Sequence, residues 1–182
     1  MKLSKKIHRE KTIQPTVNLN GSAFFLQSPS DAIFCRHLSL QYALDSLGNG
    51  KGKVNLIKHY SSVESIQQHV PIVRDAEFRA LLRHPPAGSR VIASKDFGFA
   101  LDIFFCRMMA NNVSHMSAIL YIDNHTLSVR LRIKLAADGQ LNYVVSVYDP
   151  NDTNVAVRGT HRTARGFVSL DKFISSGPDA QT

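Results

Sequence analysis

Residues 126–148, TLSVRLRIKLAADGQLNYVVSVY, decide the fold class because they contain two β-strand patterns joined by a short loop. In residues 126–135 apolar and polar side chains alternate, which is the period of a strand. Residues 142–148 are rich in β-branched and aromatic side chains, and the loop 136–140 contains Asp-Gly, a pair typical of hairpin turns. We predict an antiparallel hairpin whose polar face points to solvent: Ser128, Arg130, Arg132 and Lys134.

The sequence before this hairpin is mostly helical in pattern, and a third strand, 114–122, directly precedes it. A short strand at 18–27 and a turn at 28–31 (SPSD) come first, followed by predicted helices at 35–47, 61–70, 75–84 and 95–112. A capping box of Ser61 and Glu64 would start the second of these helices. A further strand within 155–168 and a helical turn at 169–174 complete the prediction. Helices followed by an antiparallel sheet indicate an α+β fold.

The chain of 182 residues is long enough for one domain with a substantial core. We predict a flexible basic tail at 1–17, which could act as a secretion signal, one domain at 18–174, and a short C-terminal tail at 175–182. The N-terminus lacks the apolar stretch of a Sec signal peptide, and no apolar run is long enough for a transmembrane segment.

The formal net charge is +8, and the basic residues are spread over the N-terminus, RLRIK and RGTHRTAR. They lack the interleaved aromatic side chains of a single-strand-binding sheet, which argues against nucleic acid as the partner. Attraction to an acidic protein or membrane surface explains the charge equally well. The spacing of His and Cys residues suggests neither a metal site nor a cofactor, and two cysteines are too few for a disulfide framework.

The two cysteines, Cys35 and Cys106, occupy different sequence contexts. Cys106 lies in a strongly apolar helix pattern, where a thiol usually serves as a small core residue. Cys35 lies at the predicted start of helix 35–47, where the helix dipole and nearby positive charge lower a thiol pKa. Taken alone, Cys35 is still more often a packed residue than a nucleophile, so the chemistry requires a base.

Of the eight histidines, His115 and His125 are the two candidate bases. Pairing the strands through a three-residue loop sets Val145 opposite Leu131, which brings the apolar faces of both strands together. In this register His125 and Asp149 are diagonal neighbours within side-chain reach. His115 begins the preceding antiparallel strand and should lie at the far end. The remaining histidines are interpreted as surface residues, except His37, which is too close to Cys35 along one helix to meet its sulfur.

Asp149 begins the motif DPND, and its position admits two readings. A carboxylate before proline is good turn chemistry, so Asp149 could simply cap the turn. Together with Cys35 and His125, it would complete a Cys–His–Asp order like that of papain-like enzymes. In that layout His125 deprotonates the thiol, Asp149 orients the ring, and the Cys35 backbone N–H is an oxyanion donor.

The motifs IFCRHLS, NHTLSVRLRIK and VVSVYDPND resemble the cysteine-protease domain of the Shigella enterotoxin-like type III secreted effectors, the EspL-like group. The resemblance implies a papain-like core with the triad Cys35, His125 and Asp149, in agreement with the hairpin register. The segment NLN at 18–20 also resembles the family, which implies Asn20 as an oxyanion-hole side chain. It further implies delivery by a type III system into the host cytoplasm, a secretion chaperone at the N-terminus, and a host cell-death or immune signalling protein as substrate.

Three functions therefore compete at this level. The first is a thiol protease acting on a host protein. The second is a glutamine deamidase or an acyl or amine transferase, because a thioester on the same triad can react with water or with an amine. The third is a non-catalytic module that binds a host protein; the presence of all three triad residue types argues against it.

Overall fold

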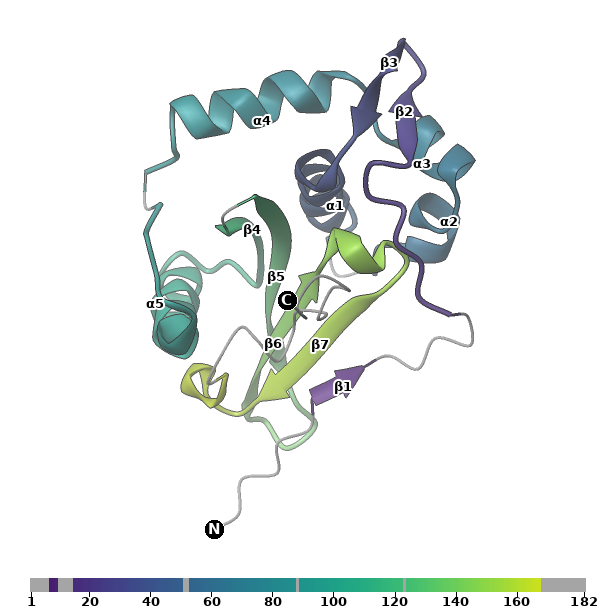
Figure 1. Cartoon of the computed structure of the whole chain (residues 1–182). Helices are drawn as coiled ribbons and strands as arrows, with labels where there is room; N and C mark the ends of the chain where they lie inside the picture. The colour runs from purple at the N-terminus through teal and green to yellow at the C-terminus, as the bar shows by residue number, and fades with distance from the viewer. Residues whose placement is uncertain (1–6, 10–14, 51–52, 88, 123, 168–182) are drawn as a thin grey trace.

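The computed structural model describes residues 7–9, 15–50, 53–87, 89–122 and 124–167 (Figure 1). Its centre is an antiparallel sheet with the strand order β1-β7-β6-β5-β4. The strands in that order are β1 (Ile7–Arg9), β7 (Ala156–His161), β6 (Leu141–Tyr148), β5 (His125–Leu135) and β4 (His115–Ile122). Helices pack on this sheet, so the predicted α+β fold is confirmed.

The predicted hairpin between β5 and β6 is present in the predicted register. Leu131 lies opposite Val145, and Val129 lies opposite Val147. Gly139 turns the loop with φ of 76°, a conformation that glycine adopts without steric cost. Burial of the apolar face therefore set the register, as expected.

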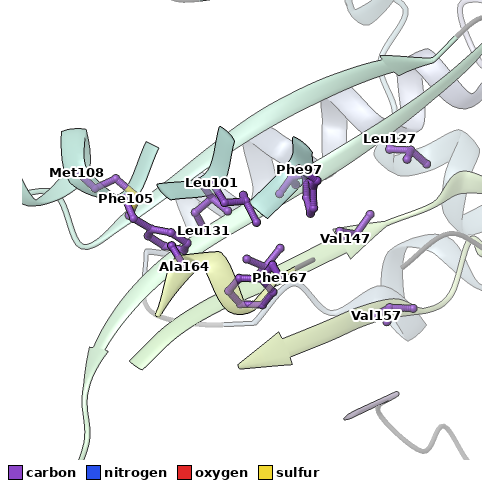
Figure 2. Close-up of a cluster of buried hydrophobic side chains, with 12 residues drawn as sticks. Phe97, Leu101, Phe105, Met108, Leu127, Leu131, Val147, Val157, Ala164 and Phe167 are labelled. Carbon is purple, nitrogen blue, oxygen red and sulfur yellow. The ribbon is translucent and has the colours of Figure 1, made fainter. Parts of the chain in front are cut away.

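The apolar face of the sheet packs against α5 (Phe97–Ala110) and the short helix η3 (Ala164–Gly166), as Figure 2 shows. The buried residues of this core are Phe97, Leu101, Phe105, Met108, Leu127, Val129, Leu131, Val145, Val147, Val157, Ala164 and Phe167. The prediction that Cys106 belongs to the core is wrong, because its side chain is exposed. Each helical residue is rotated by about 100° from the previous one, so the helix turns Cys106 outward while Phe105 faces the sheet.

The opposite face of the sheet is buried as well, beneath α1 (Cys35–Gly48). The prediction that this face is solvated is wrong for Ser128, Arg130 and Arg132, which are all buried, and holds only for Lys134. The Arg130 guanidinium donates a hydrogen bond to the Gly50 carbonyl. A long side chain of this kind can lie beneath a helix while its charged end still reaches a hydrogen-bond acceptor. The alternation of polar and apolar residues therefore does not by itself show that the polar face contacts solvent.

Helix α1 is enclosed by further elements that form a second core with it. These are β2 (Ala23–Phe25), β3 (Ser28–Ile33), α2 (Leu56–Tyr60) and α3 (Val63–His69). Helix α4 (Val73–Arg83) packs on α1 outside this core. Tyr42 of α1 stacks on Tyr148 of β6, with ring centroids 4.5 Å apart. Along α1, Leu38, Leu40 and Ala43 are buried, whereas Leu44 and Leu47 are exposed.

Two local predictions in this part of the fold need correction. Residues 28–31 form most of β3 rather than a turn, because the hairpin turns at Leu26 and Gln27. The capping box of α3 uses Ser62 and Ser65, one residue later than predicted. A hydroxyl at N3 satisfies the cap backbone as a glutamate would.

The histidines assigned to the surface are also not all free of partners. His69 contacts the Asp45 carboxylate at 2.7 Å and stacks on His59 at a ring-centroid distance of 4.0 Å. His161 packs against Phe167. Burial opposes ionisation of Asp45, but hydrogen bonds from His69, Tyr60 and Gln41 outweigh it and hold the Asp45 pKa below its usual value. Asp45 thereby ties α1 to α2 and α3.

Part of the predicted N-terminal tail pairs with the predicted domain. The segment predicted as a flexible tail, 1–17, contains β1, which pairs with β7. Val17 also donates its N–H to the Asn154 side chain, at 3.1 Å. The predicted helical turn at 169–174 and the tail at 175–182 lie outside the described residues. Among the described residues no helix is long and apolar enough to cross a membrane.

Candidate active site

Cys35 is the first residue of α1, and its side chain is half-buried. The preceding Phe34 has extended backbone and donates its N–H to Nδ1 of His37, at 3.0 Å. This hydrogen bond joins the cap residue Phe34 to His37, the third residue of the helix, so the strand ends and the helix begins within the motif FCRH. The N–H groups of the first turn have no acceptor within the helix, so the Cys35 backbone N–H points out of the helix start.

His125 and Asp149 meet where the inner strand β5 begins and its neighbour β6 ends. The distance from His125 Nε2 to Asp149 Oδ1 is 2.8 Å. The same carboxylate oxygen accepts the Asn151 backbone N–H at 2.9 Å and so caps η2 (Pro150–Asp152). The two readings of Asp149 are therefore not exclusive: one carboxylate caps the turn and also binds the imidazole.

Helix α1 and strand β5 are joined directly behind Cys35. The Ser39 hydroxyl, one helical turn after Cys35, donates to the Thr126 carbonyl at 2.7 Å within the buried interface. The Cys35 thiol lies 4.0 Å from the Asn124 carbonyl oxygen. Sequence reasoning did not identify Ser39 or Thr126, although a serine on the cysteine side of an otherwise apolar helix face was a usable signal.

The electrostatics of Cys35 and His125 are coupled. Burial alone would raise the Cys35 pKa, but hydrogen bonds to the His125 side chain and the Thr126 backbone hold it below its ordinary value. Hydrogen bonds with Asp149 and then Cys35 raise the pKa of His125 to about 9, against the effect of burial. Opposite shifts of this kind favour a thiolate beside an imidazolium at neutral pH.

A second histidine–aspartate pair lies close by in sequence and must be distinguished from the first. His37 Nε2 lies 3.0 Å from Asp75 Oδ1, while its Nδ1 accepts the Phe34 N–H. Both ring nitrogens are thus occupied, and burial lowers the His37 pKa. His37 is a neutral helix cap, so the exclusion of His37 as a base agrees with its contacts.

Asn20 is connected to the Cys35, His125 and Asp149 region through Asn151, whose backbone N–H binds Asp149. Its Nδ2 donates to Asn151 Oδ1 at 3.4 Å, and its own Oδ1 is buried with no hydrogen-bond partner among the described residues. The next residue, Gly21, donates its N–H to the Ile33 carbonyl at 3.0 Å, so residues 18–21 run beside the chain that leads into Cys35.

The structure keeps the rejected candidates away from this cluster. His115 pairs with Arg132, whereas His125 pairs with Ile122 at the other end of the same ladder. Cys106 lies on the outer side of α5. In the ranges that the structure describes, no group of three or more His, Cys, Asp or Glu side chains could hold a metal ion.

The fold and the site together define an α+β protein with a Cys–His–Asp cluster between a helix start and a sheet edge. The chain belongs to the family described as "ShET2 enterotoxin, N-terminal region", whose model matches residues 3–176. It is 40% identical over 156 residues to "Ankyrin repeat protein A" of Escherichia coli (strain K12), covering 86% of this chain and 21% of that protein. The chain thus spans about a fifth of the length of this curated relative. No solved structure matches the chain.

Membership of this family confirms the resemblance to the Shigella enterotoxin-like proteins. The family match and the similarity to the ankyrin-repeat protein together support the interpretation of this chain as part of an effector or of a protein that interacts with a host.

Proposed function

We propose that this chain is a papain-like cysteine protease domain of a secreted bacterial effector and that it hydrolyses a peptide bond in a host protein. The observation that carries the proposal is the contact at 2.8 Å between Asp149 and His125, the histidine whose pKa Asp149 and the Cys35 thiol both raise. This is the chain of nucleophile, base and orienting group that activated thiols require.

In the proposed reaction the Cys35 thiolate attacks the substrate carbonyl carbon, and the tetrahedral oxyanion forms. His125, protonated in the resting pair, gives its proton to the leaving amine as the C–N bond breaks and a thioester remains. His125 then takes a proton from water, whose oxygen attacks the thioester, and the S–C bond breaks to release the acid and the Cys35 thiolate, which restores the resting pair with His125 protonated. Asp149 holds the ring orientation and stabilises the imidazolium through both half-reactions.

The oxyanion would be held by two donors, the backbone N–H of Cys35 and the side-chain amide of Asn20. The first belongs to a helix start, where N–H groups and the positive end of the helix dipole favour negative charge. The second follows from the bond of Asn20 to Asn151, which uses one of the two amide hydrogens and leaves the other. Loss of one such donor typically costs about 10²–10³ in kcat.

The proposed setting is the host cytoplasm after delivery by a type III secretion system, with a secretion chaperone that binds the N-terminus. A host cell-death or immune signalling protein is the proposed substrate. The net charge of +8 would favour encounter with an acidic partner surface. In longer relatives the ankyrin repeats would recruit the substrate to the protease domain.

The test is an N-terminal peptide survey of a mammalian cell lysate treated with wild type, Cys35→Ala or Cys106→Ala protein. We expect new peptide N-termini with wild type and Cys106→Ala, and none with Cys35→Ala. The same thermal unfolding midpoint for all three proteins would exclude misfolding as the cause.

Identical peptide profiles for wild type and Cys35→Ala would overturn the proposal. Conversion of glutamine to glutamate without new N-termini, dependent on Cys35, would assign deamidation to the same triad in place of hydrolysis.

A further inference from the structure

Basic side chains gather on the polar face of the central sheet, further along β5 than the candidate active site. Arg130 of β5, Ser146 of β6 and Arg158 of β7 lie directly opposite one another, so their side chains leave the same face. Figure 1 shows these three strands side by side. Neighbouring strands are about 4.8 Å apart, so the Cα atoms of the two arginines are about 10 Å apart. Because the side chain between them is a small serine, both guanidinium groups can converge above Ser146.

Two further positions of β5 extend this basic surface. Arg132 and Lys134 alternate with the residues that face the α5 core, so they share the face of Arg130. Burial lowers the Lys134 pKa, and the positive charges around Lys134 lower it further. Those charges, together with Lys134, form what we call the basic cluster: Arg130, Arg132, Lys134, Arg158 and Lys53. Among the described strand residues on this face there is no aspartate or glutamate.

The same face holds buried polar atoms for which the described residues provide no hydrogen-bond partner. They are Oγ of Ser117, Oγ of Ser128, Nδ1 of His115 and Nε of Arg158. Ser117 lies opposite Arg130, and His115 lies opposite Arg132, so these atoms surround the basic cluster. Ser128 is 0% exposed. Buried polar groups in native proteins are nearly always paired with protein, water or an ion, so atoms of this kind indicate a ligand.

The chemistry of these groups selects an anion as the ligand. Guanidinium and ammonium groups only donate hydrogen bonds, and a hydroxyl or an imidazole can donate as well. Phosphate oxygens accept several such bonds at once, and arginine suits them through its planar fork of donors. One phosphate group carries a charge of about −1.5 to −2 at neutral pH, so five cations match a ligand with more than one.

The burial of the cluster indicates a small ligand rather than a surface. Arg130 and Arg132 are 4% and 7% exposed, whereas Lys134 and Lys53 are exposed. A flat membrane would therefore meet the two lysines and would not reach the two arginines. A soluble anion can pass the lysines and contact the guanidinium groups behind them.

We propose that the basic cluster is a binding site for a small soluble anion that carries several phosphate groups, held between Arg130 and Arg132 of β5 and Arg158 of β7. The bound anion replaces repulsion among the cations by attraction and so stabilises the folded chain. The site contains none of the residues of the Cys35 cluster, so it does not depend on the proposed protease function.

The test is isothermal titration calorimetry of the full chain with sodium tripolyphosphate, in buffer without divalent cations. We expect saturable binding. At a concentration about 100 times the Kd, the thermal midpoint should rise by about 5–10 °C, because the ligand binds only the folded state. Sodium chloride at the same ionic strength should give a much smaller shift, since it only screens the charges.

Three variants locate the site. Arg158→Gln should weaken tripolyphosphate binding by about tenfold, because a charge-assisted hydrogen bond is lost. Lys134→Gln changes an exposed position that does not support the core, and should weaken binding by about two- to fivefold. Arg107→Gln is the matched control: it removes the same charge from an exposed position of α5, on the other side of the sheet, and should bind as the wild type does.

The absence of saturable binding would overturn the proposal. Equal loss of affinity in Arg107→Gln and Lys134→Gln would also overturn it, because net charge alone would then attract the anion. The same would follow if sodium chloride stabilised the chain as much as tripolyphosphate. Binding to phosphatidylserine vesicles without binding to tripolyphosphate would overturn it in favour of a membrane surface.

Discussion

At the residue scale, His37 and His125 show how environment assigns different roles to one side chain. Each imidazole uses Nε2 to contact an aspartate, at 3.0 Å for His37 and 2.8 Å for His125. Nδ1 of His37 is occupied by a backbone N–H, and burial lowers the His37 pKa. For His125, by contrast, Asp149 and then the Cys35 thiol raise the pKa to about 9. Of these two histidines, His125 is therefore the one that we propose as the base for Cys35.

Iodoacetamide should label Cys35 at pH 6 at least about tenfold faster than Cys106, which is an exposed thiol. A lowered Cys35 pKa keeps the thiolate populated as the pH falls, and His125 stays protonated until the pH rises through about 9. Peptide mapping by mass spectrometry distinguishes the two sites. The rate for Cys35 should fall only below its lowered pKa.

His125→Ala should shift the labelling profile of Cys35 to higher pH, because burial then acts without the opposing hydrogen bond. His115→Ala is the control and should leave the profile unchanged, since His115 lies at the far end of the β4–β5 ladder. The reverse result would contradict the strand register on which the site is built.

At the element scale, α5 and the C-terminal part of the described chain touch at a glycine. A Cβ on Gly98 would overlap the carbonyl oxygen of Phe167 and contact that of Arg165. Gly98 interrupts an otherwise strong helix pattern, and its lack of a side chain is what lets η3 and Phe167 close over α5. The helix thus gives up propensity at one position to gain a close packing contact.

Gly98→Ala should destabilise the protein by about 1–3 kcal/mol, because the added methyl group forces backbone apart in a packed interface. The thermal midpoint should fall by about 2–4 °C for each kcal/mol. Gly48→Ala is the control: a Cβ there meets nothing within 4 Å, so calorimetry should show an unchanged or higher midpoint. A gain in stability for Gly98→Ala would show that helix propensity outweighs the contact.

At the scale of the whole molecule, residues 7–9 belong to the sheet although they lie far in sequence from its other strands. Strand β1 pairs with β7 through Ile7, His8 and Arg9 and covers the edge that β7 would otherwise expose. Unpaired edges invite association with other chains. The candidate active site lies at the start of β5, two strands away from β7 in the sheet.

Deletion of residues 1–9 should lower the thermal midpoint by about 2–4 °C, as expected for about 1 kcal/mol, and should promote self-association in size-exclusion chromatography. Deletion of residues 1–6 keeps β1 and should have neither effect. Iodoacetamide labelling of Cys35 at pH 6 should be the same in both proteins. Loss of that reactivity on removal of β1 would mean that the sheet edge supports the site.

Much of the fold was predictable because local patterns matched the tertiary environment. The β5–β6 register followed from one requirement, that Val129, Leu131, Val145 and Val147 share a buried face. The neighbourhood of His125 and Asp149 followed from that register. The burial of Arg130 was not predicted, because alternating polar and apolar residues show only that a strand has two different faces. A long polar side chain can lie under a helix as well as in water.

The sequence by itself determined the α+β class, the start of α1 at Cys35 and the contact of His125 with Asp149, because all of these depend on local periodicity and one hairpin. Only the tertiary structure decided that α1 covers the polar face of the sheet and that Ser39 fixes Cys35 beside His125. Those contacts join residues separated by some 90 positions in the chain. Long-range packing of this kind depends on the shape and charge of whole surfaces, which no short stretch of sequence encodes.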